Sequence, residues 1–158
     1  MNIPEFFVER WESEQPTFAR VLRALPADKL DYRPHERSSS AGDLAWQMVI
    51  EHGMLSDLID SGEIHYQPRE KPATLDAIVA EWEKSAQELR KRLKDLDEAK
   101  YGGPAKILAG GKTVMSNSVG NILWSFLLDL IHHRGQISTY IRPMGGKVPQ
   151  IYGPSGDA

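Results

Sequence analysis

One long helix is predicted for residues 118–144, SVGNILWSFLLDLIHHRGQISTYIRPM. Its apolar residues recur at offsets of three, four and seven positions, which is the spacing of a helix that buries one face. The positions that define this face are Ile122, Phe126, Leu130, Ile137 and Ile141. The segment therefore predicts an amphipathic helix that packs against other helices.

Two polar residues of this helix, Asp129 and His133, fall among its apolar positions. With about 100° of rotation per residue, His133 lies about 40° from Asp129 around the helix axis, and Tyr140 lies near both. A carboxylate and an imidazole one turn apart can ligate one metal ion, can hydrogen-bond to each other, or can form a buried pair. The residues alone leave these interpretations open, with both side chains expected to point inward.

The composition fits one domain, residues 1–158, with a substantial core. The absence of cysteine excludes disulfides and thiolate ligands and favours a cytoplasmic location. A formal net charge of −3 argues against nucleic acid as the main partner, because such a partner needs a basic patch. The first residues do not resemble a signal peptide, and no apolar run approaches the roughly 20 residues of a membrane span, so we expect no membrane association.

Three further helices are predicted upstream. The first covers Pro4 to Leu25, and Pro16 should kink it because proline lacks a backbone N–H. The second begins at its cap Ser40 and ends near Ile59. A third begins at its cap, Thr74, and continues through a charged segment towards residue 100.

A small hairpin is predicted before the last helix, at residues 107–115, because Gly110-Gly111 can adopt the positive φ values of a tight turn. The predicted fold class is therefore all-α, an up-down-type four-helix bundle with long first and third connections. After the bundle, residues 148–154 should form an ordered tail, since Val148, Ile151 and Tyr152 are costly to leave in water.

The second helix is apolar on nearly every side, which favours coverage by several helices or by a second subunit. We therefore expect a homodimer. Gln47 falls at the centre of the arc made by Leu44, Met54, Leu55 and Leu58, whereas His52 lies about 140° away from it. These two polar residues cannot belong to the same site.

Three segments resemble the DinB superfamily, which includes the YfiT-like proteins. They are SSAGDLAWQ at 39–47, HHRGQ at 132–136 and GKVPQIYGPS at 146–155. The resemblance covers nearly the whole chain. It implies a divalent-metal-binding four-helix bundle, often dimeric and cytosolic, whose characterised relatives are transferases or isomerases that use low-molecular-weight thiols.

The resemblance also implies a metal site on three histidines, at the positions occupied here by Gln47, Asp129 and His133. Only His133 matches the family pattern. A carboxylate remains a reasonable ligand, whereas a neutral amide is a poor one, so the site should bind Zn or Ni less well and shift towards Mn or Mg. His132, Gln136 and Tyr140 are expected around the ligands or in the adjoining pocket.

A metal-free interpretation stands beside this one. Asp129 and His133 would then form a hydrogen-bonded pair, and Gln47 would be a core amide bonded to either of them. The sequence consequently supports two hypotheses: a metal-dependent enzyme, such as a thiol transferase or a hydrolase of unidentified substrate, and a degenerate metal-free bundle that binds small molecules or proteins. It identifies no separate catalytic nucleophile.

Overall fold

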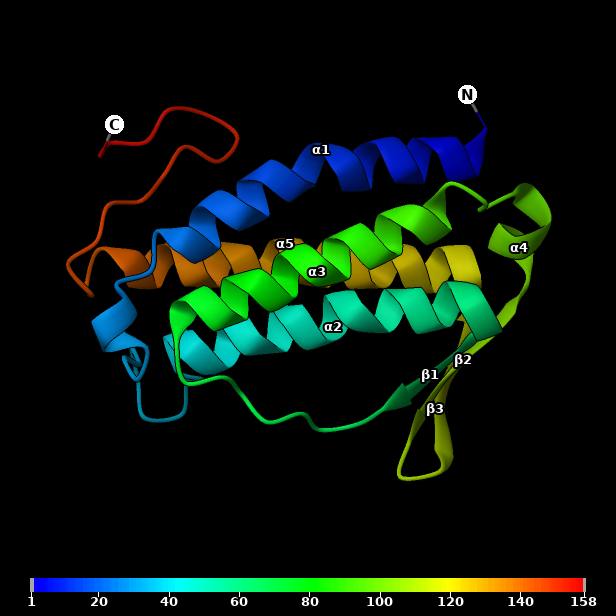
Figure 1. Ribbon diagram of the computed structural model, residues 1–158, viewed down its shortest axis with the longest axis horizontal. Helices are drawn as coiled ribbons and strands as arrows, with labels where there is room; N and C mark the ends of the chain where they lie inside the picture. The colour runs from blue at the N-terminus through cyan, green and yellow to red at the C-terminus, as the bar shows by residue number, and fades with distance from the viewer. Residues whose placement is uncertain (1, 158) are drawn as a thin grey trace.

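The computed structural model describes residues 2–157. Four long helices run side by side (Figure 1), and each contacts two of the others: α1 and α2 both pack against α3 and α5. A small sheet lies at one end of this bundle and the C-terminal tail at the other. In chain order the elements are α1 (Ile3–Arg23), η1 (Ala27–Lys29), α2 (Ala41–Ser61), β1 (Glu63–Tyr66), α3 (Leu75–Leu93), α4 (Glu98–Gly102), β2 (Pro104–Ala109), β3 (Lys112–Ser118) and α5 (Val119–Ile141).

The long helices begin where local capping chemistry allows. Ser40, Thr74 and Ser118 each accept a hydrogen bond from a backbone N–H in the first turn of α2, α3 and α5. These bonds satisfy donors that a helix start otherwise leaves without partners. The predicted starts of α2 and α3 are thereby confirmed.

One helix prediction needs correction. The third helix ends at Leu93 rather than near residue 100, and Asp97 caps the separate short helix α4. The first helix continues through Pro16, as predicted, and Figure 1 shows that α1 bends along its length. Proline removes one backbone hydrogen bond but does not end this helix.

The three-stranded sheet corrects the all-α prediction. The expected hairpin is present as the antiparallel pair β2–β3, with Gly110 at φ 55° and Gly111 at φ 75° in its turn. Strand β1 was not predicted, and it pairs in parallel with β2, with Ile64 opposite Ile107. The fold is therefore mostly helical with a small mixed sheet beside the last helix.

His52 lies in the core, as a packed histidine rather than a site residue. Its ring is fully buried and stacks between Trp82 at 4.2 Å and Trp11 at 5.6 Å between ring centroids. Trp11 Nε1–H donates to His52 Nε2 at 3.1 Å, and His52 Nδ1 contacts the Ser85 hydroxyl at 2.8 Å. Burial, followed by repulsion from Arg90, lowers the pKa of His52 from 6.5 to about 3.

The apolar faces of helix α2 are covered by other elements of the same chain. Its apolar side chains are buried against α3, α5 and β1, so they leave no large apolar face for a second subunit. The large apolar side chains that are exposed lie on other elements, for example Phe6, Val114 and Leu128. The homodimer therefore stays a prediction, but the apolar character of α2 no longer supports it.

The C-terminal tail returns to the bundle through a buried charge pair. Arg134 of α5 donates to Glu14 of α1 at 2.6 Å, and both side chains are almost fully buried. The Tyr152 hydroxyl accepts from Arg134 and lies 3.0 Å from both Glu14 oxygens. Val148 and Ile151 pack against the core, whereas the Tyr152 side chain is mostly exposed, contrary to its predicted burial.

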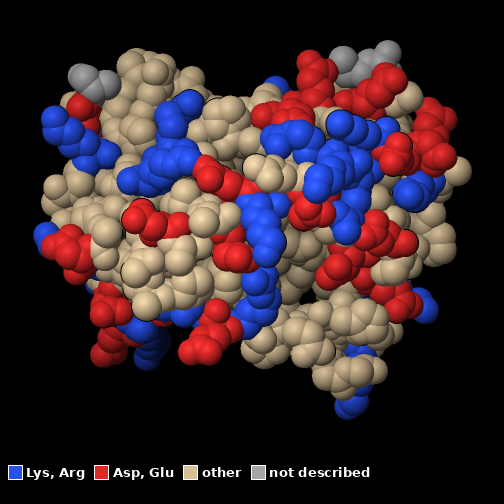
Figure 2. All heavy atoms as spheres, in the orientation of Figure 1, with Lys and Arg blue, Asp and Glu red and all other residues tan. Residues whose placement is uncertain are grey.

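Basic and acidic side chains alternate over the face shown in Figure 2, without one continuous basic patch. Among residues 2–157, no helix has the length and apolar character that a membrane span requires.

Candidate metal centre

Four polar side chains meet where α2 and α5 lie side by side. Gln47 and Glu51 are one turn apart on α2, and Asp129 and His133 are one turn apart on α5. The two pairs face each other. Each pair results from the spacing of residues along its own helix, and the packing of α2 against α5 brings the two pairs together as one cluster.

The distances show that His133 is the centre of this cluster. Its Nε2 lies 3.2 Å from Gln47 Nε2, 3.5 Å from Glu51 Oε1 and 3.6 Å from Asp129 Oδ2. Gln47 Nε2 also donates to Glu51 Oε1 at 2.8 Å. On the other side of the ring, His133 Nδ1 contacts Gln136 Oε1 at 2.8 Å, which fixes the imidazole plane.

The cluster lies at the edge of the bundle rather than in its interior. The side chains of His133 and Glu51 are 12% and 13% exposed, but Asp129 is 53% exposed and Gln47 is also exposed. The predicted inward orientation of Asp129 and Gln47 was therefore wrong. A helical wheel gives the direction of a side chain but not the extent to which neighbouring helices cover it.

Glu51 is the site residue that the sequence interpretation missed. It stands one turn after Gln47, the same offset that drew attention to Asp129 and His133. Its Oε2 atom is buried and has no hydrogen-bond partner among the described residues. A buried carboxylate oxygen without a donor is unfavourable, and a cation bound by the Glu51 carboxylate would offset this cost.

The cluster strongly perturbs one titration. The pKa of His133 is raised from 6.5 to about 9, mainly by its hydrogen bond to Glu51 and against the effect of burial. The bond to Gln136 and the charges of Glu51 and Asp129 add to this rise. Without a metal ion, the site therefore holds a proton between the imidazole and two carboxylates.

The donor set fits a divalent ion. One ligand atom each from Glu51, Asp129 and His133 can be chosen so that all lie within 4.8 Å of one another. His133 Nε2 lies 3.5 and 3.6 Å from the two carboxylate oxygens, close to the edge of a tetrahedron, which is about 3.4 Å for bonds of about 2.1 Å. Two carboxylates and one neutral imidazole would balance the charge of the ion.

The other predicted site residues differ in how close they lie to His133. Gln136 contacts His133 directly, whereas His132 is exposed, with its ring centroid 5.5 Å from that of His133. Tyr140 lies further along α5, where its ring packs against Tyr32. Gln47 contacts Glu51 and His133 through its amide, as the metal-free interpretation expects of a bonded amide.

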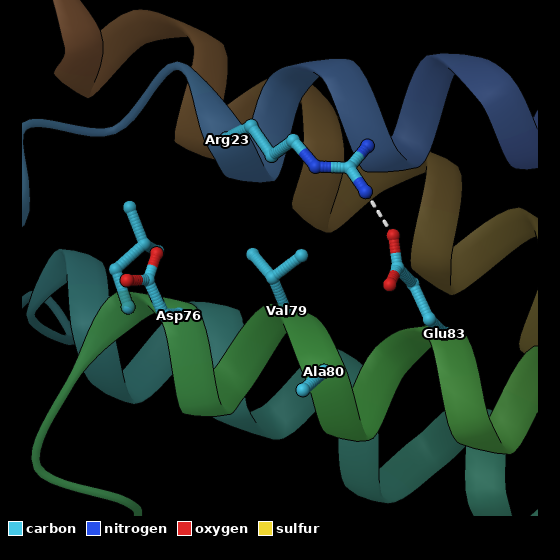
Figure 3. Close-up of a pocket in the computed structure, with 6 residues that line it drawn as sticks. Arg23, Asp76, Val79, Ala80 and Glu83 are labelled. Carbon is cyan, nitrogen blue, oxygen red and sulfur yellow. Dashed lines mark hydrogen bonds and ion pairs between the residues drawn. The ribbon is translucent and has the colours of Figure 1, made fainter.

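A cavity of about 410 Å³ adjoins the cluster and shares two residues with it. It is lined by Asp43, Trp46, Gln47, Ile50, Glu51, Tyr66, Arg69 and Lys71. Another, of about 450 Å³, lies between α1 and α3 (Figure 3), where Arg23 pairs with Glu83. None of the cluster residues lines that second cavity, so it is not connected with the candidate metal centre.

Comparisons with known proteins agree with this architecture. The sequence model of the DinB family matches residues 1–157. The protein YrdA of Bacillus subtilis (strain 168) is 22% identical over 152 residues, which is 96% of this chain and 89% of YrdA.

Solved structures with the same fold include a DinB-like protein of Bacillus cereus ATCC 10987 and YjoA, a DinB-like protein of Bacillus subtilis. The first has a TM-score of 0.79 at 17% identity, over 94% of this chain and 97% of the other. YjoA has a TM-score of 0.74 at 17% identity, over 94% and 99% of the two chains. A mycothiol-dependent maleylpyruvate isomerase aligns with a TM-score of 0.53 at 12% identity, over 92% of this chain and 62% of its own.

Proposed function

The chain belongs to the DinB family, and from this premise we propose that it binds one divalent metal ion through Glu51, Asp129 and His133. The observation that carries the proposal is the buried Oε2 atom of Glu51, which lacks a hydrogen-bond partner among residues 2–157. Asp129 and His133 were expected as ligands from the family resemblance. Glu51 takes the place of Gln47 as the third ligand, because carboxylate oxygen binds divalent ions better than a neutral amide does.

Relative to a site of three imidazoles, these donor types shift the preference towards Mn²⁺ and away from Zn²⁺ or Ni²⁺. Carboxylates suit hard ions such as Mn²⁺ and Mg²⁺, while a single imidazole still retains affinity for softer ones. Gln136 holds His133 Nδ1 at 2.8 Å and so directs Nε2 towards the carboxylates. The exposure of Asp129 leaves the outer side of the centre open to a further ligand.

The proposed activity is metal-dependent transfer to or from a small thiol, or hydrolysis. A divalent ion in such a site lowers the pKa of a bound thiol or water and so supplies a nucleophile near neutral pH. The thiol class is supported by the fold shared with a mycothiol-dependent isomerase. Glu51 and Gln47 face both the centre and the adjoining cavity, so they would position a substrate there.

Isothermal titration of Mn²⁺ and Zn²⁺ into protein stripped with a chelator tests the proposal. We expect one ion per chain, with Mn²⁺ affinity lowered at least about tenfold by Glu51→Gln, Asp129→Asn or His133→Gln. The control is Glu63→Gln with His65→Gln, which removes an exposed Glu–His pair at 3.1 Å outside the cluster. If the cluster variants bind Mn²⁺ as the control does, the site is wrong.

A second function, a metal-free binding module, is favoured by a different observation. Gln47 Nε2 donates to Glu51, and Gln136 Oε1 accepts from His133 Nδ1, so most polar groups of the cluster have partners without an ion. In that case the stripped wild-type protein should bind none of Mn²⁺, Zn²⁺, Ni²⁺ or Mg²⁺ at millimolar concentration. The same titration therefore separates the two functions.

A further inference from the structure

We propose that the 410 Å³ cavity beside the metal centre binds a small organic anion with a flat apolar body, an inference that rests on the proposed function for its link to the metal. One wall is a single face of α2, because residues 43, 46, 47, 50 and 51 follow the helical repeat. The opposite wall is Tyr66 at the end of β1 with Arg69 and Lys71 after it. The volume lies within the range of about 300–1,000 Å³ that small-molecule sites occupy.

The segment that carries the two cations is fixed to the helix. Trp46 Nε1–H donates to the backbone oxygen of Arg69 at 3.0 Å, and the Arg69 guanidinium lies over the Trp46 ring at 5.1 Å. Lys71 Nζ bonds to Asp43 at 2.5 Å. Both cations are thus positioned before a ligand arrives, which reduces the entropy that binding would cost.

The charges around the cavity leave an excess of positive charge. Three cations, Arg33, Arg69 and Lys71, are paired with two carboxylates, Asp43 and Glu81. Glu51, the remaining carboxylate of the lining, belongs to the cluster around His133, with its Oε1 atom 3.5 Å from His133 Nε2. An anionic group on the ligand would therefore be attracted to this end of the cavity.

Donors remain for that anionic group. Arg69 uses Nη2 to bond Glu81 at 3.2 Å, and Lys71 has one hydrogen bond, to Asp43, among the described residues. A guanidinium has five N–H donors and an ammonium has three, so several are left on each. Charge-assisted bonds from these donors suit a carboxylate or a phosphate.

The apolar part of the lining would contact the flat apolar body of the ligand. Ile50 and the half-exposed Tyr66 contribute apolar surface to the lining. An aromatic ring packs well against such a surface. The anion would be held at Arg69 and Lys71, and its body would extend towards Gln47 and Glu51, next to the metal ion.

Benzoate is a suitable probe, with neutral benzamide as the matched control ligand. Binding to the full metal-free chain is followed by ¹⁵N–¹H NMR at the Trp46 indole N–H, which bonds to Arg69. We expect benzoate to bind at least five times more tightly than benzamide. Lys71→Met and Arg69→Gln should each lower benzoate affinity at least threefold, while Lys112→Met at the exposed hairpin tip should leave it unchanged.

The outcomes separate this inference from the proposed function. Equal binding of benzoate and benzamide, or benzoate binding that both cavity variants leave unchanged, overturns the anion site whatever the metal titration shows. Thermal melting confirms that each variant is folded, and Tyr66→Ala gives a second, uncharged test, with weaker binding of both ligands expected. With Mn²⁺ bound, the ion should broaden the benzoate proton signals strongly; if it does not, the cavity does not serve the metal centre.

Discussion

His133 Nε2 and Glu51 Oε1 lie 3.5 Å apart across the contact between α5 and α2, and this ion pair is the main reason why the pKa of His133 is raised to about 9. The proton that it holds occupies the place of the proposed metal ion. Because a metal ion needs the neutral imidazole, proton and metal compete for the same nitrogen. Several consequences can be measured.

Metal affinity should increase with pH. Between pH 6 and about 9, binding of Mn²⁺ displaces one proton from His133, so the apparent affinity should rise about tenfold per pH unit and level off above the pKa. Titrations at pH 6.5, 7.5 and 8.5 test this. Glu51→Gln should shift the pKa of His133 downward in NMR titrations; a wild-type pKa near 6.5 would contradict the assigned ion pair.

The same pair should make the metal-free protein less stable at alkaline pH. The folded-state pKa of His133 lies above its unfolded value of 6.5, so its contribution to stability is fully present below pH 6.5 and is lost as the pH rises through about 9. Urea unfolding in the presence of a chelator, at pH 6, 8 and 10, gives the free energy. His133→Gln should remove this part of the pH dependence.

His52 should produce the opposite dependence. Its pKa is lowered to about 3, so its contribution is present above pH 6.5 and is lost as the pH falls towards 3, by at most about 1.4 kcal/mol per pH unit. His52→Gln removes the titrating group but keeps an amide for Trp11 and Ser85. The variant should lose less stability than the wild type between pH 7 and pH 4.5, measured by urea unfolding; equal losses would show that His52 is not the acid-sensitive group.

The prediction that the C-terminal tail is ordered can be tested at the Tyr152 hydroxyl. Tyr152→Phe keeps the ring over Arg134 but removes the hydroxyl that bonds to both members of the Arg134–Glu14 pair, which should destabilise the fold by about 0.5–1.5 kcal/mol. Trypsin should also cleave the variant faster after Lys147. Tyr66→Phe is the control, because its ring is half-exposed and its hydroxyl has no hydrogen bond within residues 2–157.

The sequence predicts most of the helical fold because its signals are local. The caps Ser40 and Thr74 lie within three residues of the N–H groups that they bind, and the Gly110-Gly111 turn is equally local. Strand β1 could not be predicted in this way. It is a four-residue strand directly after a helix, and its partner β2 lies about forty residues further along the chain.

The candidate site shows the same division. Asp129 and His133 stand out because they share one helix, but the involvement of Glu51 depends on how α2 and α5 are aligned. Asp129 and Gln47 are exposed because the neighbouring helices do not cover them. A helical wheel of one helix contains no information about its neighbours, so it could not predict this exposure. The family resemblance indicated Gln47, whereas Glu51 became a candidate ligand only when the structure placed its carboxylate beside Asp129 and His133.

A further prediction concerns the oligomeric state. We still expect a homodimer from the family resemblance, but α2 is covered within its own chain, so the interface would have to use exposed residues such as Leu128 or Met115. Light scattering across micromolar concentrations tests this. A dimer that Leu128→Lys converts to a monomer would locate the interface on α5, and a wild-type monomer would end the prediction.

The last prediction concerns the two positions that depart from the family pattern. Gln47 and Asp129 both lie within 3.6 Å of His133 Nε2, so replacing both with histidine should bring three imidazoles together. Because imidazole suits Zn²⁺ and Ni²⁺ better than an amide or a carboxylate does, the double variant should bind Zn²⁺ at least about tenfold more tightly than the wild type. Gln87→His with Lys91→His is the control, since it adds two histidines one turn apart at exposed positions of α3, outside the cluster. Equally weak Zn²⁺ binding by the two double variants would show that the geometry assigned to the centre is wrong. Tight binding by the variant, together with no binding of any divalent ion by the wild type, would keep the geometry and identify the natural protein as a metal-free member of its family.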